Sequence, residues 1–178
     1  MFDANALYPA LYRDLVLRFA QQGKFNPIWS DQILEELIRA LKRRTLFDSH
    51  KIENLAIQLN EAFPEALINT RVQHGYAIEC RDQNDQHVLD LALNSRSQVL
   101  VTFNLRDFPI AAALDHGLNV LHPDDFLSDA MKTNRGSTEK ILDQIQSNYR
   151  KPNVSLEDLA QQLRNSNCPK SAALLLIS

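Results

Sequence analysis

The chain has 178 residues, 44% of them hydrophobic, and a formal net charge of −3. This length allows one domain with a small appendage, no apolar run is long enough to span a bilayer, and no signal-peptide pattern is visible. The charge argues against a protein that coats nucleic acid nonspecifically, although residues 1–130 carry a net −6 and residues 131–178 a net +3. Cys80 and Cys168 lack metal-motif or disulfide spacing, so we expect reduced thiols in a cytoplasmic protein.

The first third of the chain is predicted to be mainly helical. Asp3 follows only two residues, so a strand that ends there is either unusually short or begins upstream of the sequence. Apolar residues at helical spacing predict helices over residues 9–22 and 49–62. Between them, a further helix begins at the N-cap Ser30 and ends in the basic residues 42–44.

The stretch 82–109 places polar side chains at the ends of predicted elements. Asp85 opens a helical pattern and shares its apolar face, so it points toward the core. Residues 98–103 read as a short buried strand, and Asn104 and Asp107 come directly after it. Ligands of open α/β sheets bind just outside the carboxyl ends of the strands, which is where these groups fall.

Short strands and helices continue to alternate up to residue 131. Residues 72–78 could form a strand, 110–115 a short helix, 118–121 a strand and 123–131 another helix. This alternation predicts an α/β fold with a mainly parallel sheet.

The last part of the chain has a different pattern. Residues 133–138 read as a linker, followed by one helix, a second with a capping-box-like start at Ser155, and an apolar end after Pro169. We therefore predict a domain over residues 1–131 and a small helical extension over residues 132–178.

Four carboxylates fall where this topology would gather them. Carboxylates in one dry site raise one another's pKa values, and a hard cation such as Mg²⁺ or Mn²⁺ relieves that repulsion. Such ions assist phosphodiester hydrolysis. The set consists of Asp3, Glu36, Asp85 and Asp107.

Each member of this set also has a simpler interpretation. Asp85 could cap its helix, Asp107 could cap the next one, Asp3 could be a turn residue, and Glu36 could be solvated. His87 fits a surface or core-edge position. The residue order alone leaves these alternatives open.

Four short segments combine acidic, amide and apolar residues in a distinctive order. They are Asp3-x-Asn5, Ile33-Leu-Glu-Glu36, Asp82-x-x-Asp85-x-x-Val88-Leu89, and Val101-Thr-Phe-Asn104-Leu-Arg-Asp107-Phe108-Pro109. In this order they resemble the PIN-domain ribonucleases, and most of all the subgroup with a VTFN…DFP segment that includes VapC-type toxins. The resemblance covers residues 1–130, and residues 104–109 are its most specific part.

The resemblance implies a three-layer α/β/α fold and an endoribonuclease that depends on Mg²⁺ or Mn²⁺ and leaves 5′-phosphate and 3′-hydroxyl ends. Position by position, Asp3, Glu36 and Asp85 match the family's acidic ligands. Asn104 stands where many members have an acid, so either Asn104 or Asp107 supplies the fourth ligand.

The same resemblance suggests supporting residues. Outer-shell roles are implied for Asp82, Thr102 and Asn5, with Thr102 orienting a water. The basic residues 42–44 fit phosphate contact and, equally, a helix end that complements the dipole. The candidates for phosphate contacts are Lys42, Arg43, Arg44 and Arg106.

A nuclease of this kind implies an RNA substrate and a cognate antitoxin that inserts a basic residue among the carboxylates. A homodimer is also implied, and no membrane association is expected. The amide at Asn104 supports one alternative, a catalytically weak PIN-like module that binds RNA or a partner. A second alternative, an aspartyl phosphotransferase or receiver-type domain, would need a second carboxylate near Asp3, where Asn5 stands.

Overall fold

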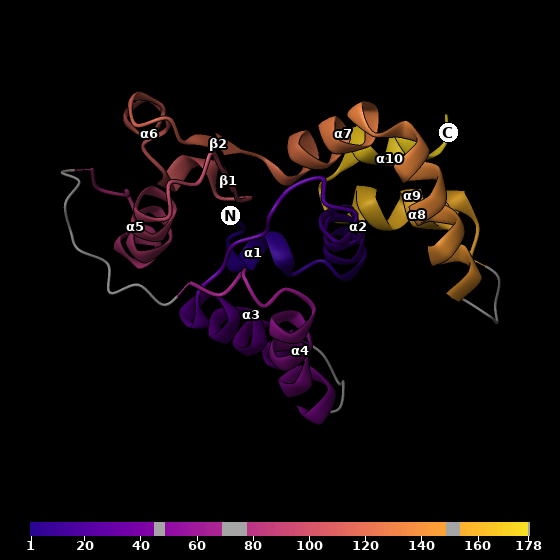
Figure 1. Cartoon of the computed structure of the whole chain (residues 1–178), viewed down its shortest axis with the longest axis horizontal. Coiled ribbons are helices and arrows are strands. Elements are labelled where there is room, and N and C mark those ends of the chain that lie inside the picture. Colours follow the sequence, from indigo (N-terminus) through magenta and orange to yellow (C-terminus); the bar gives the residue numbers. More distant parts are fainter. Residues whose placement is uncertain (45–48, 69–77, 149–153, 178) are drawn as a thin grey trace. The chain divides into compact units, whose positions relative to one another are not determined.

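The computed structural model describes residues 1–44, 49–68, 78–148 and 154–177. Contacts within the chain group them into two compact units (Figure 1). The first unit combines residues 1–8 with residues 27–122, and the second combines residues 9–26 with residues 123–178.

A small parallel sheet forms the centre of the first unit. Strand β1 (Val99–Val101) pairs in parallel with β2 (Asn119–Leu121), with Val101 opposite Leu121. On the other edge of β1, Phe2 forms a parallel bridge to Val101. The parallel sheet predicted from the sequence is therefore confirmed, although each strand is only three residues long.

Polar residues follow the carboxyl ends of these strands. The amide of Asp3 donates to the Val101 carbonyl at 3.1 Å, and the amide of Thr102 donates to the Leu121 carbonyl at 3.1 Å. The hydrogen bonding of the sheet thus extends to Asp3 and Thr102, the first polar residues after the strands.

Short and long helices surround this sheet. Ser30 caps α3 as predicted, because its Oγ accepts from the Ile33 amide at 3.3 Å. Helix α3 contacts α4 and α1, and α5 buries every residue from Val88 to Leu93. The helices of this unit are α1 (Ala4–Leu7), α3 (Asp31–Arg44), α4 (Ser49–Ala62), η1 (Gln83–Asp85), α5 (Gln86–Asn94), η2 (Leu105–Asp107) and α6 (Ile110–Asp115). The strand considered for residues 72–78 falls almost entirely outside the described residues.

The second unit is helical throughout the part of it that the structure describes. Helix α2, from the N-terminal part of the sequence, contacts α7, α8 and α9, and α10 packs on α9 and α7. The predicted domain boundary after residue 131 stays a prediction, while these contacts group α2 with the C-terminal helices. The helices are α2 (Ala10–Gln21), α7 (Pro123–Thr133), α8 (Arg135–Asn148), α9 (Leu156–Asn165) and α10 (Pro169–Leu175).

The linker predicted over residues 133–138 is wrong. Helix α7 ends at Thr133 and α8 begins at Arg135. The Thr138 hydroxyl donates to the Met131 carbonyl at 3.2 Å, which ties the two helix ends together. Tertiary packing of the buried residues of α8 therefore overrides the weak helix propensity of Gly136 and Ser137. The capping box at Ser155 is confirmed, with Asp158 as its partner.

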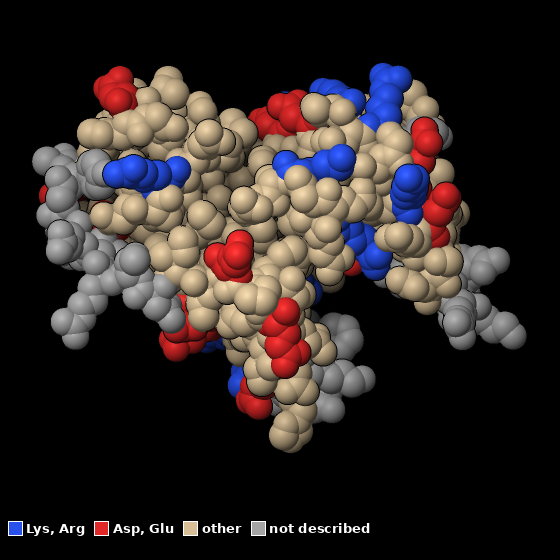
Figure 2. Space-filling model, in the orientation of Figure 1, with Lys and Arg blue, Asp and Glu red and all other residues tan. Residues whose placement is uncertain are grey.

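The surface of the second unit carries charges of both signs. On the face shown in Figure 2, Lys and Arg side chains gather over α2 and α7–α10, with Asp and Glu side chains among them. Within α9, Arg164 and Glu157 form an ion pair. The net positive charge of the C-terminal sequence therefore does not make this face purely basic.

None of the helices in the described ranges is both long and apolar enough to cross a membrane.

A buried carboxylate fastens α10 to α7. Asp124 is 3% exposed and accepts from the Lys170 amide, the Ser171 amide and the Ser171 hydroxyl, each at 2.8 Å. These amides belong to the first turn of α10, which has no earlier carbonyls to satisfy them. Asp124 therefore supplies the acceptors that this helix end lacks.

We expect Asp124→Ala to lower the free energy of unfolding of the second unit by about 2–4 kcal/mol, since it leaves buried donors unsatisfied. Urea denaturation followed by circular dichroism measures this loss. Asp125→Ala is the matched control, because Asp125 forms an exposed ion pair with the Lys170 side chain and should change the midpoint little. Equal effects of the two substitutions would contradict the role given to Asp124.

Candidate active site

A cavity of about 570 Å³ opens at the carboxyl end of the sheet in the first unit. This volume lies in the range of small-molecule sites, roughly 300–1,000 Å³. Six of the twelve predicted site residues come together here from separate elements. The cavity is lined by Asp3, Ala4, Asn5, Tyr8, Glu36, Ala40, Arg43, Asp85 and Asn104.

Asp3 is a buried residue of this cavity, and a side-chain hydroxyl group orients its carboxylate. It is 3% exposed, and Thr102, which is fully buried, donates its hydroxyl proton to Asp3 Oδ2 at 2.7 Å. Burial has the largest effect on the pKa of Asp3 and raises it; hydrogen bonds from Thr102 and from the Ala4 and Asn5 backbone lower it, and the charge of Glu36 raises it, with a net upward shift. Thr102 thus orients Asp3 directly.

The same hydroxyl group organises the loop after β1. Thr102 Oγ1 accepts from the Asn104 amide at 3.1 Å, and Asn5 Oδ1 accepts from the Phe103 amide at 3.0 Å. Asn5 and Thr102 side chains also lie 3.3 Å apart. Two residues predicted to support the site, Asn5 and Thr102, therefore fix the backbone that carries Asn104.

Asp85 lies at the junction of η1 and α5 and occupies the N-cap position of α5. Its side chain makes no capping hydrogen bond, so the carboxylate does not serve the helix end as the simpler interpretation would require. Its Oδ2 atom is buried and has no hydrogen-bond partner among the residues described. Burial, followed by the charges of Asp3, Asp82 and Asp107, raises the pKa of Asp85 from 3.8 to about 6.

Glu36 and His87 meet at the edge of the cavity. His87 Nδ1 lies 2.8 Å from the Asn84 carbonyl, so that nitrogen carries a proton. The other ring nitrogen, Nε2, lies 3.3 Å from Glu36 Oε1. The contact places Glu36 beside α5, and the charge of His87 lowers the pKa of Asp85.

The remaining acidic candidates lie farther from the cavity. Asp82 Oδ1 accepts from the Asn84 amide at 2.9 Å and caps η1. Asp107 ends η2 and is absent from the cavity lining, whereas Asn104 belongs to it. Both carboxylates act on the site through their charges, which raise the pKa of Asp85.

The basic candidates separate into different surroundings. Arg43 lines the cavity. Lys42 instead faces a groove between α3 and α4, where its Nζ lies 2.6 Å from Glu53 Oε1. Arg106 is exposed on η2, and the side chain of Arg44 lies outside the described part of the chain.

The donor chemistry of the cavity fits a hard divalent cation. Among the described residues, no three His, Cys, Asp or Glu side chains already converge closely enough to bind one ion. However, Asp3 and Asp85 share a cavity, the charge of Asp3 raises the pKa of Asp85, and Asp85 has a buried oxygen without a hydrogen-bond partner among the described residues. Asp3, Asp85 and Glu36 are therefore the side chains that could hold a metal ion, with Asn104 as a neutral oxygen donor.

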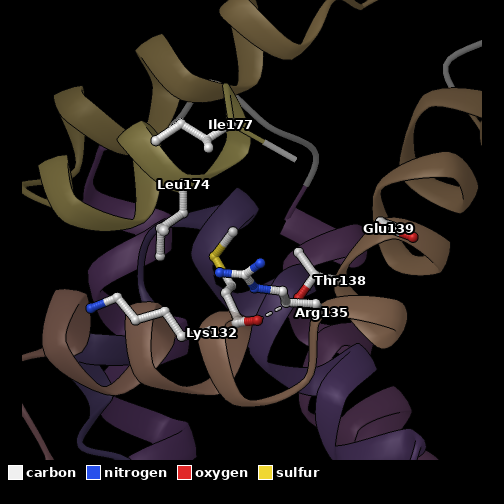
Figure 3. A pocket seen from close by; sticks show the side chains of 7 residues that line it. Lys132, Arg135, Thr138, Glu139, Leu174 and Ile177 are labelled. Atoms are coloured by element: carbon white, nitrogen blue, oxygen red, sulfur yellow. Dashed lines mark hydrogen bonds between the residues drawn. The ribbon is translucent and has the colours of Figure 1, made fainter.

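A second cavity, of about 150 Å³, lies in the second unit and has a different character. Figure 3 shows Lys132, Arg135 and Leu174 around it, while Glu139 lies apart from the other labelled side chains. A dashed line marks the bond from the Thr138 hydroxyl to the Met131 carbonyl. With one carboxylate in its lining, this cavity lacks the paired acids of the first.

Several residues at the first cavity, Ala4 among them, were not predicted as site residues. Tyr8 and Ala40 line it, and His87 contacts Glu36. The spacing of Glu36, Ala40 and Arg43 at i, i+4 and i+7 was the signal in the sequence that could have found Ala40.

Comparisons with known proteins agree with this arrangement. Residues 1–106 match the PIN domain family, and residues 123–176 match the family described as the VapC50 C-terminal domain. A curated protein of Mycobacterium tuberculosis (strain ATCC 25618 / H37Rv), named "Putative ribonuclease VapC50", is 40% identical over 58 residues. No solved structure matches.

The match to the mycobacterial protein spans 33% of this chain and 34% of that protein. The PIN domain match is longer and covers more than half of the chain, including Asp3, Glu36, Asp85 and Asn104. It confirms the α/β fold predicted from the sequence. The chain therefore belongs to the PIN-domain family and carries a C-terminal segment of the VapC50 type.

Proposed function

We propose that this protein is a divalent-metal-dependent endoribonuclease and the toxin of a type II toxin–antitoxin pair. The observation that carries this proposal is the pairing of Asp3 and Asp85 in one cavity, where the pKa of each is raised. Two such carboxylates destabilise a metal-free site and become favourable when a cation neutralises them.

Asp3, Asp85 and Glu36 would hold Mg²⁺ or Mn²⁺. A bound ion of this type polarises a phosphodiester and lowers the pKa of a water molecule. Thr102 keeps Asp3 in one orientation through its 2.7 Å hydrogen bond. Asp85 would contribute its Oδ2 atom, which has no hydrogen-bond partner among the described residues.

Asn104 would complete the set of metal ligands. It lines the cavity with its backbone fixed by Thr102, and its neutral amide oxygen attracts a cation less than a carboxylate would. We propose Asn104 as the fourth ligand, and we propose that Asp82 and Asp107 act on the bound ion through their charges without touching it. Cleavage would leave 5′-phosphate and 3′-hydroxyl ends.

The assignment of RNA as substrate rests on the relative, whose printed name describes a ribonuclease. A free ribonuclease endangers its own cell, so we also propose a cognate antitoxin that neutralises the cavity. A basic side chain of that partner would pair with Asp3 and Asp85. The predictions of a homodimer and of a cytoplasmic location stay predictions.

Incubation of the purified chain with a panel of single-stranded RNAs and tRNAs tests the proposal. We expect cleavage with Mn²⁺ and none with EDTA. The same preparation carrying Asp85→Asn should be inactive, and cleavage that persists in this variant would indicate a contaminating nuclease. No metal-dependent cleavage of any RNA by the wild type would refute the nuclease function.

The alternative is a PIN-like module that binds RNA or a partner without cutting. Two observations favour it: the amide at Asn104, and the lack of three converging ligands among the described residues. RNA binding by a chain that never cleaves would support this alternative.

A further inference from the structure

One wall of the acidic cavity is a single face of α3. Glu36, Ala40 and Arg43 line it at helical spacing, so they lie in a row along the helix. Seven residues of helix separate Glu36 from Arg43 by about 10 Å along the axis. The small side chain of Ala40 leaves room between the acid and the base.

An aromatic residue from another element also lines the cavity. Tyr8 directly follows α1 and lines the same cavity. Its position is fixed, because its amide donates to the Asn5 carbonyl at 3.3 Å and the Asn5 side chain accepts from the Phe103 amide. Helix α1 also contacts α3. The ring and the guanidinium group are therefore held on two elements that pack together.

We propose that Tyr8 and Arg43 form a nucleotide-binding subsite beside the paired carboxylates, an inference that rests on the proposed function. Tyr8 stacks on the base of a nucleotide next to the scissile phosphate, and Arg43 binds a neighbouring backbone phosphate. Aromatic side chains bind unpaired bases in this way, and Arg matches the geometry of phosphate oxygens.

The charges around the cavity explain why the subsite needs Arg43. Asp3, Glu36 and Asp85 repel a polyanion, and Arg43 is the basic residue that lines the same cavity among those described. Lys42, its neighbour in sequence, is held by Glu53 in another groove. Lys42→Ala is therefore a matched control, with the same loss of one positive charge on the same helical turn.

Binding can be tested without cleavage. The full chain carrying Asp85→Asn is mixed in EDTA with a fluorescein-labelled, unstructured RNA of about twelve nucleotides, and anisotropy gives the dissociation constant. We expect Tyr8→Leu to weaken binding about tenfold and Tyr8→Phe less than about twofold. Arg43→Ala should weaken binding and reduce the slope of log K against log salt by about 1, whereas Lys42→Ala should change neither.

An abasic scan tests the stacking partner directly. RNAs that lack one base at each position in turn should show one position that costs about tenfold in affinity, and this loss should vanish when Tyr8→Leu is added. The scan on a chain with native Tyr8 remains informative if the Leu variant fails to fold. The subsite would be overturned if no abasic position changed the affinity for RNA. It would also be overturned if Lys42→Ala and Arg43→Ala lowered the affinity equally.

The two proposals fail separately. RNA binding that depends on Tyr8 and Arg43 without any Mn²⁺-dependent cleavage by the wild type would refute the nuclease function and keep the subsite. Cleavage of RNA with unchanged KM and kcat in Tyr8→Leu and Arg43→Ala would refute the subsite and keep the nuclease.

Discussion

Replacing Asp85 with Asn is expected to reduce metal-dependent RNA cleavage by at least about 100-fold. The substitution keeps the size of the side chain and removes the charge of a half-buried carboxylate whose Oδ2 atom has no hydrogen-bond partner in the described structure. Single-turnover cleavage of a labelled RNA with saturating Mn²⁺ measures the effect. Asp129→Asn, on the exposed surface of α7, is the control and should cleave at the wild-type rate.

The same variant should be at least as stable as the wild type in EDTA. The pKa of Asp85 is raised to about 6 in the folded chain, so the folded state binds a proton more tightly than the unfolded state. The stability that this group contributes is therefore fully present below about pH 4 and is lost as the pH rises through about 6. Thermal melts between pH 4 and 7 should show a larger fall in the wild type than in Asp85→Asn, which retains only the contribution of Asp3 at this site. A large loss of stability in the variant would instead assign Asp85 a structural role.

Thr102→Val is expected to damage activity and stability together. It preserves the shape of the side chain but removes the hydroxyl that donates to Asp3 and accepts from the Asn104 amide. We expect cleavage to fall by about 10–100-fold, because Asp3 loses its orienting partner. Since Thr102 is fully buried, the free energy of unfolding should fall by about 1–3 kcal/mol.

Thr102→Ser separates the hydroxyl group from the methyl group. It retains the donor and acceptor, so kcat should stay within about threefold of the wild type, and a measurement of kcat and KM for both variants compares them. If Ser and Val at position 102 reduce kcat equally, orientation of Asp3 by the hydroxyl is not the cause.

The sequence identified much of the site because short patterns specify which side of an element a residue occupies. The apolar positions of α5 predicted that Asp85 points inward, and the structure places it in the cavity. Asn104 was predicted to follow a strand over residues 98–103; the strand ends earlier, at Val101, and both Thr102 and Asn104 follow its carboxyl end.

Contacts between separate elements could not be predicted in the same way. Tyr8 carries no signal for catalysis in the sequence, and it lines the cavity beside Glu36 because α1 packs on α3. The distinction between Lys42 and Arg43 depends on their angular positions around α3 and on the location of Glu53 in α4. Such positions follow from tertiary packing.

The second unit shows the same limit. The amphipathic pattern of α2 predicts that one face is buried, but it does not identify α7, α8 and α9 as the neighbours. Gly136 and Ser137 suggested a linker, yet the buried residues Ile141 and Ile145 stabilise a continuous helix from Arg135. At this point of the chain, tertiary packing outweighs the low helix propensity of the local sequence.

Anomalous diffraction from crystals soaked in Mn²⁺ would show whether Asp3 and Asp85 together hold a divalent cation. We predict a peak ~2.2 Å from a carboxylate oxygen of each residue, which disappears in crystals of Asp85→Asn. Well-ordered crystals that bind Mn²⁺ only elsewhere, or not at all, would contradict the account.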